Sequence, residues 1–210
     1  QTVMTWTAAP PILKSLLIAV ALVLLPVIAS AQAPPLGKPV FCDETYALCI
    51  KALCQPIVGK NGTIKYANCA CDVRQGWSMG PGSCLSRRPL VRNGRTFLVS
   101  TYSNFYNKTN QTMSCSSSSQ LWAWCYGAPC VVDRADPTKT TCTCPVYTGA
   151  MYTLGGQCGK DGNDGCNSLW SAATPKADNG ANKLFAAYMT LHGYPHFGPA
   201  DMCPTTSTGK

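Results

Sequence analysis

The longest apolar run of the chain, Leu16–Ile28, lies near its N-terminus. One cation, Lys14, precedes this run, and the small residues Ala29-Ser30-Ala31 follow it. This order of charge, apolar core and small residues is typical of a secretory signal peptide. A membrane-spanning helix needs ~20 apolar residues, whereas this run is shorter and Pro26 interrupts it. We therefore predict a signal peptide over residues 1–31, with an uncleaved membrane anchor as the alternative.

Two later segments follow the pattern of β-hairpins. Asn61-Gly62 separates two β-prone runs in PIVGKNGTIKYANCACDV, and Asp136-Pro137-Thr138 separates two in VVDRADPTKTTCTCPV. Each turn sequence predicts a hairpin that carries a Cys-x-Cys pair on its return strand. Because residues i and i+2 of a strand face the same side, both sulfurs of each pair are expected to point inward and to bond different neighbours.

Two further segments predict one strand and one helix. Arg95–Tyr106 is rich in β-branched and aromatic residues, which favours a strand between the two hairpins. Asn182–Gly193 has the apolar period of a helix, and Gly193 and Pro195 end it. Its expected apolar face consists of Leu184, Phe185, Tyr188 and Leu191. The predicted fold is small, disulfide-rich and mainly β, with two duplicated β-hairpin units plus a C-terminal helix.

The cysteines show how the chain is organised. All 14 cysteines follow the predicted signal peptide, and an even number in an exported chain predicts a framework of up to seven disulfides. Twelve of them form two sets of six with similar spacing. The first set is Cys42, Cys49, Cys54, Cys69, Cys71 and Cys84, and the second is Cys115, Cys125, Cys130, Cys142, Cys144 and Cys158. We expect three bridges within each set, and a seventh between Cys166 and Cys203 that holds the C-terminal tail.

The two sets also share neighbouring residues. YALCIKALC aligns with WAWCYGAPC, and CACDVRQG aligns with CTCPVYTG, which matches Ala47 to Ala123 and Val73 to Val146. Similar spacing with shared neighbours indicates internal duplication. The predicted regions are 1–31, a signal peptide; 32–41, a Pro-containing N-terminal linker; 42–114, cysteine-rich unit A with a connecting strand; 115–158, cysteine-rich unit B; and 159–210, a C-terminal tail with one helix.

This duplicated pattern resembles a group of uncharacterised cysteine-rich exported proteins of Gram-negative bacteria. The resemblance rests on the export signal, aromatic-Ala-x-Cys-x-x-Ala-x-Cys, the hairpin, Cys-x-Cys and a closing Gly-x-Cys, and it covers residues 42–158. It implies a periplasmic or secreted location. It carries no activity, so no catalytic residue follows from it.

The charge of the chain points to anionic partners. The formal net charge is +8, from 17 Lys and Arg against 9 Asp and Glu. Four of the six arginines lie within one short segment, at Arg87, Arg88, Arg92 and Arg95. Guanidinium groups match the geometry of phosphate and sulfate, so this cluster is the candidate anion-binding site, with ordinary solvated surface as the alternative.

Other chemistries have weaker signals. Cys-x4-Cys and Cys-x-Cys have enough thiols for zinc, but export and the even cysteine count favour disulfides, so we predict no metal and no cofactor. The chain has one glutamate and two histidines, His192 and His196, and Gly193 breaks the helix between them. The tryptophans that are candidates for stacking on a ligand, or for packing against cystines in the core, are Trp77, Trp122, Trp124 and Trp170.

These observations favour an exported, disulfide-stabilised structural or binding module that is non-enzymatic and has no catalytic residues. It would present a surface to a macromolecular partner in the cell envelope or outside the cell. The expected partner is a protein or an envelope polyanion and not a specific nucleic acid, with membrane contact only if the N-terminal segment stays uncleaved. The alternatives are a small secreted hydrolase using aspartates or His192 between the units, and a polyanion-binding envelope protein acting through Arg87–Arg95.

Overall fold

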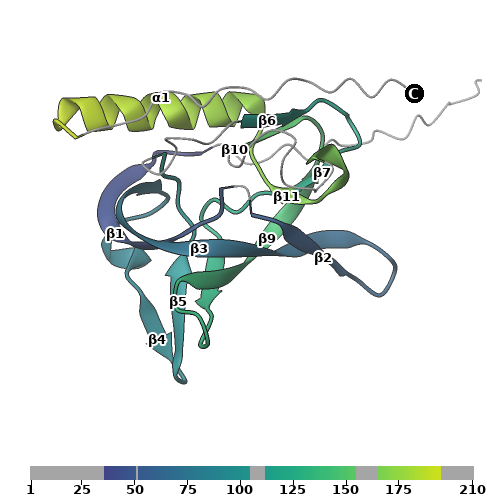
Figure 1. The fold of residues 1–210 in the computed structure, drawn as a ribbon, viewed down its shortest axis with the longest axis horizontal. Helices are drawn as coiled ribbons and strands as arrows, with labels where there is room; N and C mark the ends of the chain where they lie inside the picture. The colour runs from purple at the N-terminus through teal and green to yellow at the C-terminus, as the bar shows by residue number, and fades with distance from the viewer. Residues whose placement is uncertain (1–35, 51, 105–111, 155–164, 195–210) are drawn as a thin grey trace, which may run out of the picture.

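A computed structural model describes residues 36–50, 52–104, 112–154 and 165–194 of the protein. The predicted signal peptide, His196, Cys158 and Cys203 lie outside these residues. The described part is mainly β, with six disulfides and one α-helix, as the sequence predicts. Figure 1 shows the helix lying along one side of a twisted sheet. No described helix is long and apolar enough to cross a membrane.

The main sheet has the strand order β1-β3-β9-β8-β5-β4. These strands are β1 (Val40–Leu48), β3 (Ile64–Gly80), β4 (Leu90–Arg92), β5 (Arg95–Val99), β8 (Pro129–Val132) and β9 (Lys139–Thr148). Beside this path, β2 (Cys54–Val58) pairs with β3, and β7 (Leu121–Ala123) pairs with β9 and with β11 (Trp170–Ser171). A second, two-stranded sheet consists of β6 (Thr112–Cys115) and β10 (Met151–Leu154). Short 3₁₀ turns span Leu85–Arg87 and Gly165–Asn167, and α1 spans Pro175–Leu191.

The two predicted hairpins are confirmed, and they meet along their return strands. β2 pairs with β3 across the Asn61-Gly62 turn, and β8 pairs with β9 across the turn that contains Asp136-Pro137-Thr138. β3 and β9 then pair with each other in antiparallel register, with Cys69 opposite Cys142. Both units therefore share one sheet.

Corresponding residues of the two units occupy corresponding pairing positions. Cys54 lies opposite Cys69 in one hairpin, and Cys130 lies opposite Cys142 in the other. Beyond each hairpin a further strand joins the same edge. There Ala47 of β1 pairs with Val73 of β3. In the other unit, Ala123 of β7 pairs with Val146 of β9. The residues that align in sequence thus also align in strand register.

The Cys-x-Cys prediction is confirmed, because each sulfur of a pair bonds a different neighbour. The nested bridges are Cys54–Cys69 inside Cys49–Cys71, and Cys130–Cys142 inside Cys125–Cys144. All eight of these cysteines are buried. Two outer bridges join Cys42 to Cys84 and Cys115 to Cys166. Disulfides in such numbers are typical of proteins in oxidising compartments.

Two expectations about the bridges are wrong. We expected Cys166 to bond Cys203 and the second set to have three bridges of its own, but Cys166 bonds Cys115, a member of that set. The 3₁₀ turn that carries Cys166 lies beside β6, which carries Cys115. A sulfur bonds the partner that the fold brings within reach, and sequence spacing alone does not determine that choice.

Cystine side chains make up much of the hydrophobic core at the main sheet. One core cluster combines the eight nested cysteines with small residues, including Ala47, Ala67 and Ala123, and with Leu98. The Sγ atoms of Cys49 and Cys142, which belong to bridges in different units, lie 3.3 Å apart. The two units therefore share one core, a point that the sequence leaves open.

The helix begins earlier than predicted. It starts at Pro175, seven residues before the expected Asn182, because Thr174 caps it and accepts a hydrogen bond from the amide of Ala177. Its buried face is Asp178, Ala181, Phe185 and Met189. Phe185 is thus buried as expected, whereas Leu184 is 46% exposed and Leu191 is 80% exposed. The buried face of the helix therefore follows Ala181, Phe185 and Met189 and shares only Phe185 with the buried residues that we predicted.

The connecting strand is shorter than predicted. β5 ends at Val99, and beyond it single bridges join Ser100 to Ala47 and Tyr102 to Met79. The chain leaves the ladder there and approaches α1, so of the described residues 95–104 only the first five form a strand.

We expect reductant to open the outer bridges first. Cys84 and Cys166 are exposed, whereas every sulfur of the nested bridges is buried. Thiolate attack needs access to a sulfur. Limited reduction of the native protein, followed by differential alkylation and mass spectrometry, should label Cys42, Cys84, Cys115 and Cys166 before the nested cysteines. Earlier labelling of Cys69 or Cys142 would contradict the buried core.

Candidate functional site

The predicted arginine cluster lies on a hairpin that projects from the body. β4 and β5 join through Asn93 and Gly94, which have φ values of 50° and 66°. Positive φ at both central residues is the geometry of a type I′ turn, for which Asn-Gly is the preferred sequence. The Asn-Gly signal was present in the sequence, but only the strand after it was predicted. Figure 1 shows this hairpin on the side of the sheet away from α1.

Like charges face each other at the tip of this hairpin. Arg92 and Arg95 lie directly opposite each other in the strand register, and both are exposed. Arg134, in the neighbouring turn, is also exposed and donates a hydrogen bond from Nη2 to the carbonyl of Asn93 at 3.4 Å. Within the described residues, none of these three arginines forms an ion pair. The tip therefore concentrates three guanidinium groups.

The two acidic residues on either side of Arg134 in sequence accept hydrogen bonds from residues of their own turn. Asp133 accepts a hydrogen bond from the amide of Ala135 at 2.8 Å. Asp136 accepts from both the amide and the hydroxyl of Thr138, which lowers the pKa of its carboxyl. Their backbone roles match the turn contexts that the sequence indicates for aspartate.

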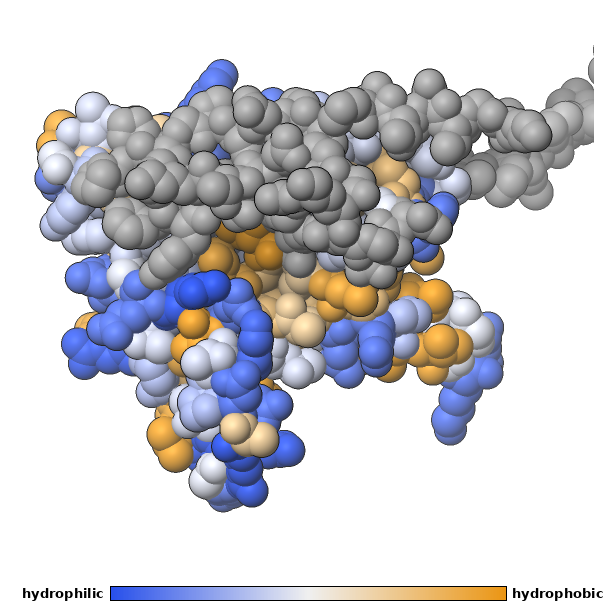
Figure 2. Space-filling model, in the orientation of Figure 1, coloured by the Kyte–Doolittle hydropathy of each residue, from blue (hydrophilic) through white to orange (hydrophobic). Residues whose placement is uncertain are grey.

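Apolar side chains accompany the charges on the hairpin. Leu90 lies opposite Phe97, two residues from the arginine pair, so these four residues share one face of the hairpin. Val91 lies on the other face and is 67% exposed. Figure 2 shows hydrophilic and hydrophobic surface side by side on this projection. The hairpin thus carries cationic and apolar side chains close together along its length.

Arg87 and Arg88 differ sharply although they are adjacent. The guanidinium of Arg87 is buried, with Nη2 3.1 Å from Oε1 of Glu44 and Nε donating to Oε2 at 3.2 Å. Its Nη1 donates to the carbonyl of Val40 at 3.0 Å. Arg88 points outward and is exposed. Of the four predicted anion-binding arginines, Arg87 already has a carboxylate partner, and Arg88, Arg92 and Arg95 face solvent.

The other predicted candidates are scattered. His192 caps the C-terminal end of α1, is exposed, and has its ring centroid 4.3 Å from that of Tyr188. Trp122, Trp124 and Trp170 are buried together in a core cluster, as expected for tryptophans that pack against cystines. Trp77 is half-buried. Its ring centroid lies 5.3 Å from those of Tyr188 and Tyr194.

Two groups of three sulfurs lie close enough to hold a metal ion: Cys49, Cys130 and Cys142, and Cys69, Cys125 and Cys144. All six of these cysteines are in disulfides. The thiolate is the form of cysteine that binds metals, and a cystine sulfur is not a thiolate. In the oxidised protein these groups are therefore packing contacts.

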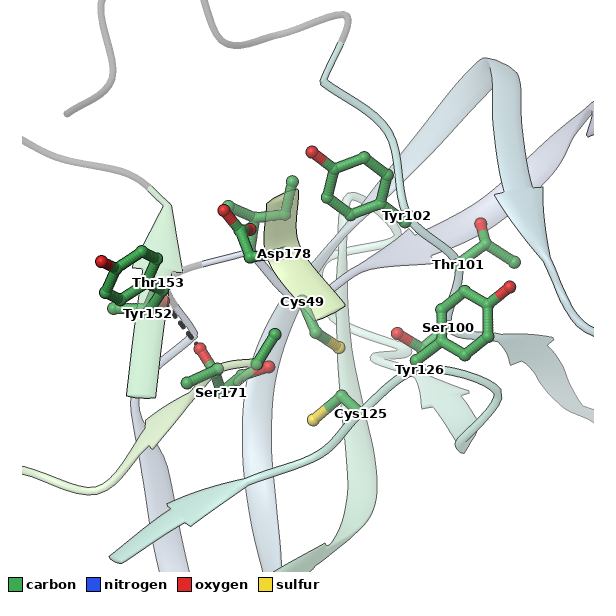
Figure 3. Close-up of a pocket in the computed structure, with 13 residues that line it drawn as sticks. Cys49, Ser100, Thr101, Tyr102, Cys125, Tyr126, Tyr152, Thr153, Ser171 and Asp178 are labelled. Atoms are coloured by element: carbon green, nitrogen blue, oxygen red, sulfur yellow. Dashed lines mark hydrogen bonds between the residues drawn. The ribbon is translucent and has the colours of Figure 1, made fainter. Parts of the chain in front are cut away.

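A cavity that the sequence does not indicate lies between the start of α1 and the sheet (Figure 3). It is lined by Cys49, Ile50, Ser100, Thr101, Tyr102, Cys125, Tyr126, Tyr152, Thr153, Ser171, Ala172, Ala173 and Asp178. These residues come from both units and from the C-terminal segment. No short sequence pattern could have indicated the cavity, because the fold assembles it from distant segments.

Asp178 is the one carboxylic acid among the described residues that line this cavity. Its Oδ2 accepts a hydrogen bond from Nδ2 of Asn182 at 3.1 Å, and Oδ1 of Asn182 accepts from the hydroxyl of Tyr102. The side chain is only 8% exposed, and burial raises the pKa of Asp178 to about 6, a rise that the Asn182 hydrogen bond partly offsets. Burial and the nearby Asp178 also raise the pKa of Tyr102 well above its ordinary value.

Replacing Arg87 should destabilise the fold. Arg87→Met leaves the Glu44 carboxylate, 7% exposed, without its charged partner, and breaking a buried pair in this way costs about 3–5 kcal/mol. The matched variant Arg88→Met removes an exposed guanidinium and should change the free energy of unfolding by less than about 0.5 kcal/mol. Guanidinium chloride unfolding of both variants measures the difference, and equal midpoints would contradict the buried pair.

Asp178 should make the protein less stable as pH rises. The folded-state pKa of about 6 exceeds the ordinary value of 3.8, so the folded state binds the proton more tightly than the unfolded state does. The stabilisation is complete below about pH 4 and disappears as pH rises to about 6, a loss of roughly 2–3 kcal/mol. Asp178→Asn should remove this loss in urea unfolding measured from pH 4 to 7. An unchanged pH profile in Asp178→Asn would contradict it.

Comparison with known proteins does not assign this site. No protein-family model, no curated protein and no solved structure matches the chain. The resemblance to cysteine-rich exported proteins of Gram-negative bacteria stays a prediction from the residues. The function is therefore inferred from the chemistry of the arginine hairpin and the cavity.

Proposed function

We propose that this protein is an exported binding module, periplasmic or secreted, that uses its arginine hairpin to bind the phosphate-bearing surface of anionic envelope lipid. The module would be built from two copies of one six-cysteine unit. The equivalent register of Cys54–Cys69 and Cys130–Cys142 supports this duplication. So do Gly76 and Gly149, which align in sequence and have φ values of 125° and 128°.

The opposed pair of Arg92 and Arg95 is the observation that carries the proposal. Like charges directly opposite each other destabilise a strand pair. The described residues supply no carboxylate to offset this repulsion. A phosphate between the two guanidinium groups would remove it and would accept hydrogen bonds from both. Phosphate binding would thus remove a repulsion between Arg92 and Arg95 that destabilises the hairpin in the free protein.

The apolar residues of the hairpin select among polyanions. Val91 is 67% exposed and Leu90 is 46% exposed. A soluble acidic glycan or a nucleic acid has no acyl chain that could cover these two side chains. Anionic lipid combines phosphate groups with acyl chains, so it complements cationic and apolar side chains together. This proposal sharpens the sequence alternative of a polyanion-binding envelope protein. It also places membrane contact on the hairpin, whereas the sequence links it to the N-terminal segment.

The test is vesicle co-sedimentation of the exported, oxidised protein. We expect binding to vesicles of phosphatidylglycerol and phosphatidylcholine, falling as salt is raised, and little binding to phosphatidylcholine alone. Arg92→Gln with Arg95→Gln should weaken binding about ten-fold or more, since each cation near an anionic membrane contributes about 1 kcal/mol. Val91→Ser should weaken vesicle binding as well.

A matched control separates the hairpin from overall charge. Lys60→Gln with Lys65→Gln removes the same charge from the exposed tip of the β2–β3 hairpin and should leave vesicle affinity within about two-fold. Equal losses in the two double variants would mean that only net charge matters. Binding to soluble polyphosphate as tight as to vesicles, unaffected by Val91→Ser, would identify a soluble polyanion and overturn the lipid proposal.

A further inference from the structure

The cavity beside α1 contains a carboxylate, Asp178, that has no counter-ion among the described residues. Among the described residues that line it, Asp178 is the only one with a carboxyl group, and none is Lys, Arg or His. Within the described residues, Asp178 forms no ion pair and accepts a hydrogen bond only from the neutral amide of Asn182. A buried carboxylate normally has a cationic partner, because its desolvation is otherwise uncompensated.

Three tyrosine rings surround the same cavity. Tyr102 follows β5, Tyr126 follows β7, and Tyr152 belongs to β10, and Figure 3 shows all three with Asp178. The face of an aromatic ring carries negative charge density and attracts cations, most strongly where water is excluded. The tyrosine rings and the Asp178 carboxylate therefore both favour a cation in the cavity.

Two hydroxyl groups at the cavity also have no partner. Thr101 is 4% exposed, and its Oγ1 makes no hydrogen bond with the described residues. The hydroxyl of Tyr126 is buried and likewise unpartnered, and burial raises the pKa of Tyr126 to about 12. Buried polar groups without partners are uncommon and costly. The oxygen of each hydroxyl group could accept a hydrogen bond from an N–H donor.

We propose that this cavity binds a small protonated primary amine, with the Asp178 carboxylate as its counter-ion and the tyrosine rings and free hydroxyls around it. The remaining lining combines cystine, alanine and isoleucine with Ser100, Thr153 and Ser171, and its apolar part suits a short alkyl chain. A divalent metal fits less well, because Ca²⁺ prefers six to eight oxygen ligands and the cavity has one carboxylate. This site is separate from the arginine hairpin, so each proposal can fail without the other.

The probe is n-butylammonium, with n-butanol as its neutral analogue of similar shape. Both are titrated into the full, oxidised protein at pH 7.5 and constant ionic strength, and amide shifts are followed by ¹H–¹⁵N NMR. We expect saturable shifts from n-butylammonium at residues 100–102, 125–126 and 171–173. We expect n-butanol to bind at least about ten-fold more weakly, because it lacks the charge that Asp178 attracts.

Variants then assign the binding to the carboxylate. Asp178→Asn keeps the shape and the acceptor oxygen, and should weaken n-butylammonium binding about ten-fold or more. This variant is expected to be more stable at neutral pH, so lost binding cannot result from unfolding. Asp43→Asn makes the same charge change at an exposed position of β1 and should leave the affinity unchanged.

Lowering the pH provides a second readout. In the part of the chain that the structure describes, the titratable groups that line the cavity besides Asp178 are tyrosines and bonded cysteines. With a pKa of about 6, Asp178 is mostly protonated at pH 5, so affinity should fall about ten-fold between pH 7.5 and pH 5. Equal affinity for n-butanol, binding retained in Asp178→Asn, or no binding of either probe would each overturn the proposal.

Discussion

The antiparallel pairing of β3 with β9 is the constraint on which the rest of the structure depends. It places Cys69 opposite Cys142 and so brings the nested bridges of both units into one core. A sheet of this size would normally bury branched apolar side chains, but here cystines and alanines fill that space. Small residues leave room for disulfides between paired strands. The same cystines therefore link the strands covalently and fill the core.

Much of this arrangement follows from local sequence, and the exceptions have physical reasons. Turn residues such as Asn61-Gly62 act over a few positions, so both hairpins and the inward Cys-x-Cys sulfurs could be predicted. The pairing of β3 with β9 is a long-range contact between strands that have other partners as well, and no local signal specifies it. The same holds for the Cys115–Cys166 bridge, because it joins the second set to the C-terminal tail and sequence spacing does not determine such a pairing. The early helix start at Thr174-Pro175 was missed because Asp178 and Gly180 interrupt the apolar period.

The candidate site was predictable only in part for a related reason. Sequence shows that arginines cluster, but it does not show which way each side chain points. Arg87 belongs to a 3₁₀ turn that directs it inward to Glu44, whereas Arg92 and Arg95 flank a tight turn and face solvent. Asp178 gave no signal, because a single aspartate in a polar stretch resembles any solvated residue. Its environment comes from Tyr102 and from the cavity, which distant segments form together.

The nesting of the bridges also bears on how the chain matures. Each inner pair joins residues only 15 or 12 positions apart, and each outer member of a nest spans 22 or 19. Short loops close at low entropic cost. Each inner and outer bridge of a nest can therefore close within its own unit, without a thiol from the other unit. Cys84 and Cys166 then close spans of 42 and 51 residues, which lock strands that the hairpins have already aligned. The local hairpins thus favour the nested pairings over most of the alternatives that this many cysteines allow.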